Sequence, residues 1–323
     1  QQWKVEQIPP TEITSAGQKD ERIIEDLPEE AAFIAEPKSI EKTKPAQVKN
    51  IDENIVLYNE DIKITVGLLG GSIKRTELLN YFKTISENSE NIKLLDFTDE
   101  YYVAQSGLLH DKKSTNKELK SLAPNHHELF SVKSKNNQSL VLEWENKGAK
   151  IKVLKKIYLD KSGYIVHVKN TVINNSNRAW IGRQYRQIRR QSNGEGRSWV
   201  APTFTGGAYY DEAYNKISYE EISEEKPKFN VINGWVAMME HYFVSSWVFS
   251  GNKTNLFYTK EILVDDVRND YIIGARSEPV LIQPNEKGEL SSKLYVGPKL
   301  QIELEKIAPG LELTIDYGVL TFL

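Results

Sequence analysis

Residues 234–249 constrain the fold most, because they carry almost no charge and five of these sixteen residues are aromatic. Residues 235–239 alternate as a strand does, and residues 243–249 are apolar apart from two serines. Such runs are typical of strands buried on both faces, and each is too short to cross a bilayer. The stretch therefore predicts two core strands that reverse near Glu240 and His241. We expect these side chains in the hydrophobic core: Trp235, Tyr242, Phe243 and Trp247.

Short apolar segments separated by turn residues recur along most of the chain. Residues 140–144, 151–159 and 164–173 follow one another at the spacing of an antiparallel meander, with turns at residues 146–148 and 160–163. Alternating strands with short, regularly spaced turns indicate a sandwich of two sheets. The prediction is an all-β fold, and we expect its body to cover residues 51–297.

Residues 1–50 differ from the rest of the sequence. They hold five of the twelve prolines, and their ten acidic and seven basic residues account for the whole net charge of −3. A segment with so few apolar residues cannot bury enough surface to offset the entropy of ordering it. We therefore expect a disordered tether.

The last residues, 298–323, change character again. Pro298 stands where a helix accepts its first residue, and Leu300, Leu304 and Ile307 share one helical face. Residues 311–315 alternate between apolar and polar, which predicts a strand with one wet face. Both elements are expected to lie against the sandwich. The chain would then leave it at three residues: Asp316, Tyr317 and Gly318.

Motifs for catalysis, metal binding and cofactors are missing from the sequence. There is no cysteine, no Gly-x-Ser-x-Gly and no dinucleotide fingerprint, so we expect no cofactor. Gly70-Gly71 is expected to be a turn, because no Gly-Lys-Ser/Thr accompanies it. His126 and His127 would point to opposite faces of a strand, which disfavours a metal site. The weak net charge excludes long-range attraction of nucleic acid.

An arginine cluster is the sharpest charge feature. Read as one strand, it places Arg183 and Arg189 on one face and Arg186 and Arg190 on the other. Contact with the phosphates of lipid head groups or of RNA is one interpretation, since the guanidinium group matches phosphate. The alternative, which we favour, is a solvated edge strand whose charges oppose edge-to-edge pairing.

Several long motifs resemble one family, the large periplasmic domain of the YidC membrane protein insertase of Gram-negative bacteria. They are GWVAMMEHYFVSSWV (234–248), TFTGGAYYDEAYNKISY (203–219), SEPVLIQP (277–284), LYVGPKL (294–300) and IAPGLELTIDYGVLTFL (307–323). Weaker agreement runs through residues 51–81 and 155–172, so the resemblance covers nearly all of residues 51–323.

The resemblance implies a β-supersandwich similar to galactose mutarotases, with a short helix at its C-terminal end. It implies a non-enzymatic periplasmic domain, set between the first two transmembrane helices of an inner-membrane protein that inserts and folds membrane proteins. The implied partners are nascent inner-membrane proteins and the Sec components SecF, SecD and SecY. The implied junction with the membrane part covers Pro298, Leu300, Leu304, Ile307, Asp316, Tyr317 and Gly318. Candidate partner contacts are Thr203, Phe204, Tyr209, Tyr210, Tyr214 and Tyr219.

Two other classes of function stay open from the sequence. A carbohydrate- or peptide-binding module would need an exposed aromatic platform. An aldose-epimerase-like enzyme would need a histidine acid and a glutamate base that converge in a cleft. A cleft without such chemistry would favour the insertase interpretation.

Because no nucleophile, metal set or acid–base pair is recognisable, we expect no mutarotase activity. The measurement is the rate at which the optical rotation of α-glucose or α-galactose relaxes in the presence of the protein. Acceleration well above buffer that disappears when one histidine is replaced would contradict this expectation.

Overall fold

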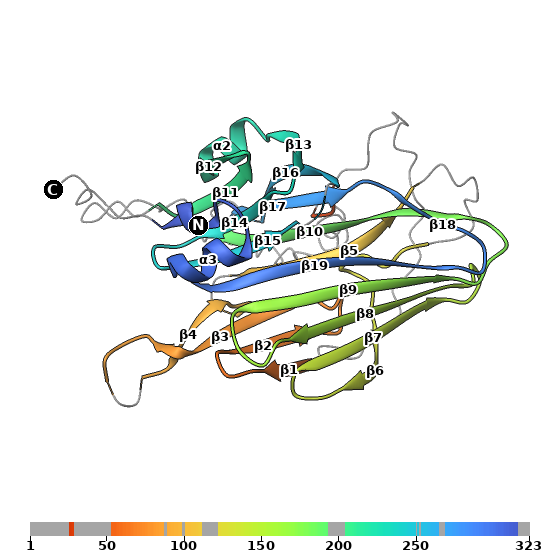
Figure 1. The fold of residues 1–323 in the computed structure, drawn as a ribbon, viewed down its shortest axis with the longest axis horizontal. Coiled ribbons are helices and arrows are strands. Elements are labelled where there is room, and N and C mark those ends of the chain that lie inside the picture. Colours follow the sequence, from red (N-terminus) through yellow and green to blue (C-terminus); the bar gives the residue numbers. More distant parts are fainter. Residues whose placement is uncertain are drawn as a thin grey trace, which may run out of the picture.

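The structure is a computed structural model, in which two antiparallel β-sheets face each other (Figure 1). It describes residues 26–28, 53–86, 89–98, 101–111, 122–192, 204–249, 251, 253–264 and 269–315. The predicted all-β sandwich with a short C-terminal helix is confirmed. Within these residues no helix is both long and apolar enough to cross a membrane.

The first sheet has ten strands among the described residues. Its main path runs β1 (Asn54–Tyr58), β2 (Ile62–Gly67), β3 (Ile73–Phe82), β5 (Tyr102–His110), β10 (Trp180–Ser192), β17 (Asn269–Ser277), β16 (Thr254–Leu263) and β13 (Lys228–Ile232). Off this path, β4 (Asn91–Leu95) pairs with β3, and β18 (Val280–Ile282) pairs with β10.

The second sheet has nine strands in the part of the chain that the structure describes. They are β12 (Ala213–Ile217), β11 (Gly206–Asp211), β14 (Trp235–Met239), β15 (Phe243–Val248), β19 (Lys287–Pro298), β9 (Ile165–Asn174), β8 (Ile151–Leu159), β7 (Ser139–Asn146) and β6 (Ser131–Lys135). The described helices are α2 (Tyr219–Glu224), α3 (Gln301–Ile307) and the 3₁₀ helix η1 (Leu311–Thr314).

The main hydrophobic core lies between the two sheets. On β8 and β9 every second side chain is buried, as expected for strands with one face toward the core. Val153, Ile157 and Val168 from these strands join Leu57 and Phe257 of the first sheet in one cluster. The predicted meander is thus confirmed.

The hairpin of β14 and β15 is buried on both faces, as predicted from residues 234–249. Trp235, Trp247 and Phe243 are buried, but Tyr242 is 68% exposed, so its expected place in the core is wrong. The Glu240 N–H donates to the Phe243 carbonyl and closes the reversal. Tyr242 lies in that turn and points away from both sheets' interiors because the turn, unlike the strands, has no covering layer.

The Gly70-Gly71 pair turns the chain between β2 and β3, as predicted. Both residues have positive φ, 69° and 61°, which glycine adopts without strain. A Cβ on Gly70 would lie 2.4 Å from the His126 backbone, so the turn also needs glycine for this close approach.

Lys155 joins the two sheets from β8. Its ammonium group is buried and donates to the carbonyls of Gly70, at 2.6 Å, and Ser106, at 2.9 Å. Burial lowers the pKa of Lys155 from 10.5 to about 7, because the charged form loses its hydration.

We predict that Lys155→Met removes part of the pH dependence of stability. The folded lysine loses its proton above about pH 7, whereas the unfolded one holds it up to 10.5. Stability of the wild type should therefore rise with pH in this window, with a contribution of about 1.4 kcal/mol per pH unit from this group. Urea unfolding at several pH values measures the slope.

The matched control is Lys156→Met, because Lys156 is the next residue on β8 and its side chain is exposed. This variant should keep the wild-type slope. An unchanged slope in Lys155→Met would show that burial does not lower the pKa of Lys155.

Candidate functional site

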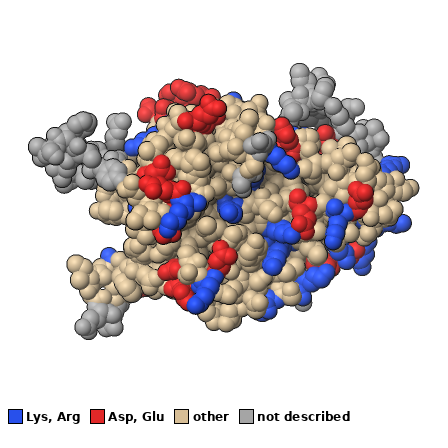
Figure 2. Space-filling model, viewed as in Figure 1, with Lys and Arg blue, Asp and Glu red and all other residues tan. Residues whose placement is uncertain are grey.

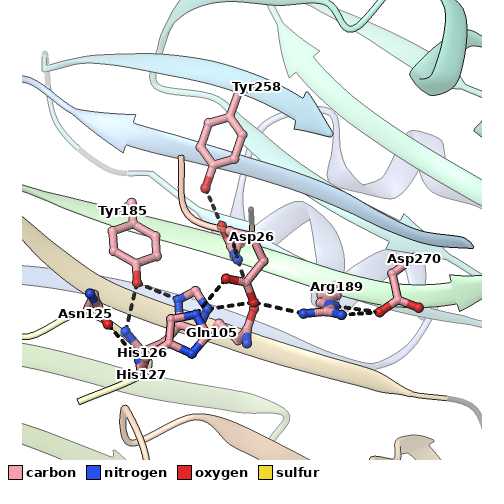
Figure 3. A network of polar contacts seen from close by, with 10 residues as sticks. Asp26, Gln105, Asn125, His126, His127, Tyr185, Arg189, Tyr258 and Asp270 are labelled. Carbon is pink, nitrogen blue, oxygen red and sulfur yellow. Dashed lines mark hydrogen bonds and ion pairs between the residues drawn. The ribbon is translucent and has the colours of Figure 1, made fainter. Parts of the chain in front are cut away.

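A buried polar network lies around β10, on the face of the first sheet opposite the main core (Figure 3). β10 pairs with β5 on one side and β17 on the other, so its backbone bonds are made within the sheet. Tyr185, Gln187 and Arg189 alternate along it and therefore share one face. The expected edge strand is wrong, since the arginine-bearing strand is central.

Asp26 lies at the centre of this network, although it belongs to the predicted tether. Its side chain is 1% exposed, and Pro28 is buried as well. Its carboxylate oxygens lie 2.6 Å from His127 Nε2, 3.0 Å from His126 Nε2 and 2.8 Å from Arg189 Nη1. Asp26 of the expected tether therefore contacts the sandwich. Apart from residues 26–28, that segment lies outside the described residues.

We call His126, His127, Gln187 and Arg189 the Asp26 pocket. Gln187 Nε2 donates to the Asp26 carbonyl at 2.9 Å, so the pocket holds the backbone as well as the carboxylate. The Gln187 side chain is held in turn by Gln105, at 2.9 Å, and by Tyr258, whose hydroxyl donates at 2.7 Å.

Tyr185 orients the His126 ring. Its hydroxyl oxygen accepts the His126 backbone N–H at 2.9 Å and lies 2.6 Å from Nδ1 of the same residue. The hydroxyl proton then goes to Nδ1, which favours the ring proton on Nε2, facing Asp26. The Nε2 contact has the distance of an ion pair but not the angles of a hydrogen bond.

The charges of the network shift its titrations. Burial alone would raise the pKa of Asp26, but the contacts with His126 and His127 outweigh it and hold the pKa well below the usual range. Burial lowers the pKa of His126, and the Asp26 carboxylate offsets part of this effect. At neutral pH the carboxylate is therefore ionised and His126 is mainly neutral.

The prediction that His126 and His127 point to opposite faces is wrong. They lie in a turn rather than a strand, and their rings approach to 4.0 Å between centroids. Within the described residues, Asp26, His126 and His127 form a group whose ligand atoms lie within 4.8 Å of one another. Arg189 forms an ion pair with the same carboxylate, however, and its positive charge disfavours the binding of a second cation there. The arrangement suits an anion better than a metal.

Three of the four arginines considered for lipid contact are held inside the protein. Arg186 donates to Asn255 at 2.5 Å, and burial lowers its pKa to about 10. Arg190 pairs with Glu240 at 2.9 Å, and Arg189 pairs with Asp270 and Asp26. Arg183 is more exposed and lies 3.9 Å from Asp111. Lipid binding through Arg186, Arg189 and Arg190 would require these contacts to break.

The C-terminal elements dock on the outer face of the second sheet, where α3 lies beside β19 (Figure 1). Leu304 of α3 and Leu311 of η1 are fully buried against a cluster that includes Trp235 and Val248. The Trp235 indole N–H donates to the Pro309 carbonyl at 3.0 Å. We call this contact the C-terminal docking surface.

Two local predictions for this segment are wrong. Pro298 ends β19 and the helix begins at Gln301, because β15 pairs with β19 as far as Pro298. Residues 311–315 form no strand. Gly310, at φ 73°, starts a 3₁₀ helix in which Leu311 and Thr314, three residues apart, share the buried face. Leu304 is buried and Ile307 half-buried, while Leu300 is 42% exposed.

The aromatic residues proposed for partner contact are half-buried and contact other rings. Tyr210 and Tyr214 pack on Trp235, each with centroids 6.1 Å apart. Tyr209 packs on Phe257 at 4.9 Å, and Tyr219 stacks on Tyr271 at 4.4 Å. Phe204 lies beneath Lys216 and beside the docking surface. Four residues of the predicted sites lie outside the described residues: Thr203, Asp316, Tyr317 and Gly318.

Sequence reasoning missed the residues that build the network. The arginine cluster pointed to the right strand, but Asp26, Gln105, Tyr258 and Asp270 come from segments with no motif. One signal was present in the sequence. The polar residues of β10 interrupt a strand that could otherwise pack in a hydrophobic core, and they indicate a polar face on this sheet.

The fold, the Asp26 pocket and the C-terminal docking surface define the class of this protein. It is a two-sheet β-sandwich domain on which residues 26–28 and the C-terminal helices dock. A profile described as YidC periplasmic domain matches residues 54–323. The chain therefore belongs to the YidC periplasmic domain family, and the resemblance noted in the sequence is confirmed.

Curated relatives agree with this assignment. The membrane protein insertase YidC of Thioalkalivibrio sulfidiphilus is 35% identical over 289 residues, covering 87% of this chain and 51% of the relative. That of Methylobacillus flagellatus is 32% identical over 327 residues, covering 99% and 57%. The chain spans about half the length of these relatives.

Similar solved structures share little sequence. A galactose mutarotase related enzyme from Lactobacillus acidophilus has a TM-score of 0.49 and 10% identity, covering 76% of this chain and 97% of that one. A galactose mutarotase-like protein from Lactobacillus casei has a TM-score of 0.49 and 9% identity, covering 76% and 100%. Similarity at this level carries no information about chemistry.

We predict that Leu304→Ala destabilises the domain by about 2–5 kcal/mol, because it leaves a cavity under α3. Ile302→Ala is the matched control, since Ile302 is on the same helix and 69% exposed. It should change stability by less than about 0.5 kcal/mol. Equal effects in urea unfolding would contradict the docking of α3.

Proposed function

We propose that this chain is a non-enzymatic periplasmic part of an inner-membrane insertase, which assists the insertion and folding of membrane proteins alone or with the Sec translocon. Family membership over residues 54–323 and the names of the curated relatives support this proposal. Nascent membrane proteins are the substrate class, and SecF, SecD and SecY are the candidate translocon partners.

The C-terminal docking surface is the observation that carries the proposal. Leu304 and Leu311 are buried on the sheet and Trp235 holds the Pro309 carbonyl, so the path of the chain from β19 to Ile315 is fixed. In the proposed setting the membrane part follows this segment. A fixed exit would hold the sandwich at a defined height and tilt above the membrane part.

The polar network supports a non-enzymatic role. Two histidines and a carboxylate do converge there, as an aldose-epimerase-like enzyme would need. The carboxylate, however, is Asp26 of the N-terminal segment, and its oxygens contact the Nε2 atoms of both histidines. The side chains of Asp26 and His126 are each 1% exposed, so a sugar could not reach them without displacing residue 26.

The surface offers no large region of one charge on the face shown in Figure 2. Acidic and basic side chains are mixed over it, apart from an acidic group at the top over α2. Partner recognition would then depend on local contacts, with the half-buried aromatic residues around β11 and β12 as candidates, rather than on long-range attraction.

The test is complementation of cells depleted of their own insertase. The full-length protein with Leu304→Asp and Ile307→Asp should support growth poorly, because two buried or half-buried carboxylates undock α3. Ile302→Asp, on the exposed side of the same helix, should support growth as the wild type does.

Expression of each variant is matched by immunoblot. Full growth with the double variant would overturn the proposal that docking of α3 matters for insertion. Poor growth with Ile302→Asp alone would shift the role from docking to the exposed face of the helix.

A further inference from the structure

The Asp26 pocket is built by the sandwich, while its occupant comes from a distant segment. His127 and Gln187 are 101 and 161 residues away from Asp26 in sequence. Gln187 and Arg189 project from β10, a central strand whose backbone pairs on both sides. These donors are therefore fixed by the sheet and not by the segment that they hold.

Each donor also has a second partner that does not involve Asp26. Arg189 Nε donates to Asp270 at 2.6 Å, so this guanidinium group keeps a carboxylate if Asp26 leaves. Gln187 donates to Gln105, and the His127 backbone N–H donates to Asn125 at 2.8 Å. The pocket is thus oriented before the carboxylate arrives, which lowers the entropy cost of binding.

We propose that this pocket is a carboxylate-binding site and that residues 26–28 occupy it as an intramolecular ligand. The ligand class is an aspartyl side chain in a peptide, with its carboxylate on the histidines and the arginine. The backbone carbonyl of Asp26 accepts a hydrogen bond from Gln187, and Pro28, two residues later, is buried. The N-terminal segment is thereby fastened to the sandwich at one point. This inference is independent of the insertase proposal.

The distances indicate that the histidines and the arginine bind the carboxylate directly. They do not fit a metal ion shared between these groups. Two nitrogen ligands and an oxygen on one zinc ion would each lie about 2.0–2.2 Å from the metal and therefore more than 3 Å from one another. Asp26 lies 2.6 Å from His127 Nε2, and Arg189 donates to the same carboxylate at 2.8 Å. These are distances of charge-assisted hydrogen bonds.

The first experiment replaces the occupant. Asp26→Ala should fold, because Arg189 retains Asp270, and it should melt at a lower temperature than the wild type. Sodium acetate should raise the melting temperature of this variant toward that of the wild type, since acetate fits the vacated position. Sodium chloride at equal ionic strength is the salt control.

Asp160→Ala is the matched protein control. Asp160 also pairs with a histidine, His167, at 2.8 Å, but its side chain is 60% exposed. Acetate should not stabilise this variant more than chloride does. Equal rescue of both variants, or no rescue of Asp26→Ala, would overturn the proposal.

The second experiment supplies the ligand in trans. The acetylated, amidated tripeptide Asp-Leu-Pro should bind Asp26→Ala about tenfold or more tightly than Asn-Leu-Pro, because hydrogen bonds to a charged group are lost with the amide. Wild-type protein should not bind it, since its own segment fills the pocket. Isothermal titration calorimetry measures the affinity of Asp26→Ala for each of the two peptides and that of the wild type for Asp-Leu-Pro.

A third experiment measures how accessible the Asp26 carboxylate is in the intact protein. Carbodiimide labelling of carboxylates, followed by mass spectrometry, should leave Asp26 unlabelled in the wild type while it labels Asp160. In His127→Ala the labelling of Asp26 should rise about tenfold.

Stabilisation of the wild type by zinc that disappears in His127→Ala would instead show a metal site and overturn the proposal. Labelling of Asp26 in the wild type at the rate of Asp160 would overturn it as well.

Discussion

The central position of β10 is the constraint on which most of this structure depends. It pairs with β5 and β17, so it has no free edge, and the side chains of Gln184, Arg186 and Gln187 are buried. A buried arginine is tolerated only with a partner. Asp26 and Asp270 form ion pairs with Arg189, and Glu240 forms one with Arg190. The strand therefore requires acidic residues from distant segments, and Asp26 of the N-terminal segment is one of them.

The hairpin of β14 and β15 connects this network with the C-terminal docking surface. Trp235 pairs with Val248, and Val236 pairs with Trp247, so the two tryptophans lie on opposite faces of the second sheet. Trp247 points inward and donates to the Gln187 carbonyl at 3.1 Å, whereas Trp235 points outward and donates to Pro309. The near absence of charge in residues 234–249 follows from this position between two covering layers.

Period and turn chemistry were enough to predict most of the fold. The alternation along β8 and β9 and the apolar run of β14 and β15 depend on neighbours in sequence, so they are visible there. The 3₁₀ helix at residues 311–314 was missed because Leu311, Leu313 and Ile315 alternate with polar residues as in a strand, although Leu313 is in fact 50% exposed. Asp26 and the turn at His126 were missed because their partners lie about a hundred residues away, and no periodicity records such a contact.

The two terminal segments are held by opposite kinds of interaction, and this difference has a consequence for how each can move. The C-terminal docking surface is mainly apolar, so its strength grows with buried area and tolerates small shifts of α3. The Asp26 pocket depends on charge-assisted hydrogen bonds, whose energy falls steeply with misalignment. A small displacement of β10 against β5 or β17 would therefore weaken the hold on Asp26 while leaving Leu304 docked. Because Trp247 joins β15 to the Gln187 carbonyl, the hairpin of β14 and β15 links α3 and Trp235 to the pocket.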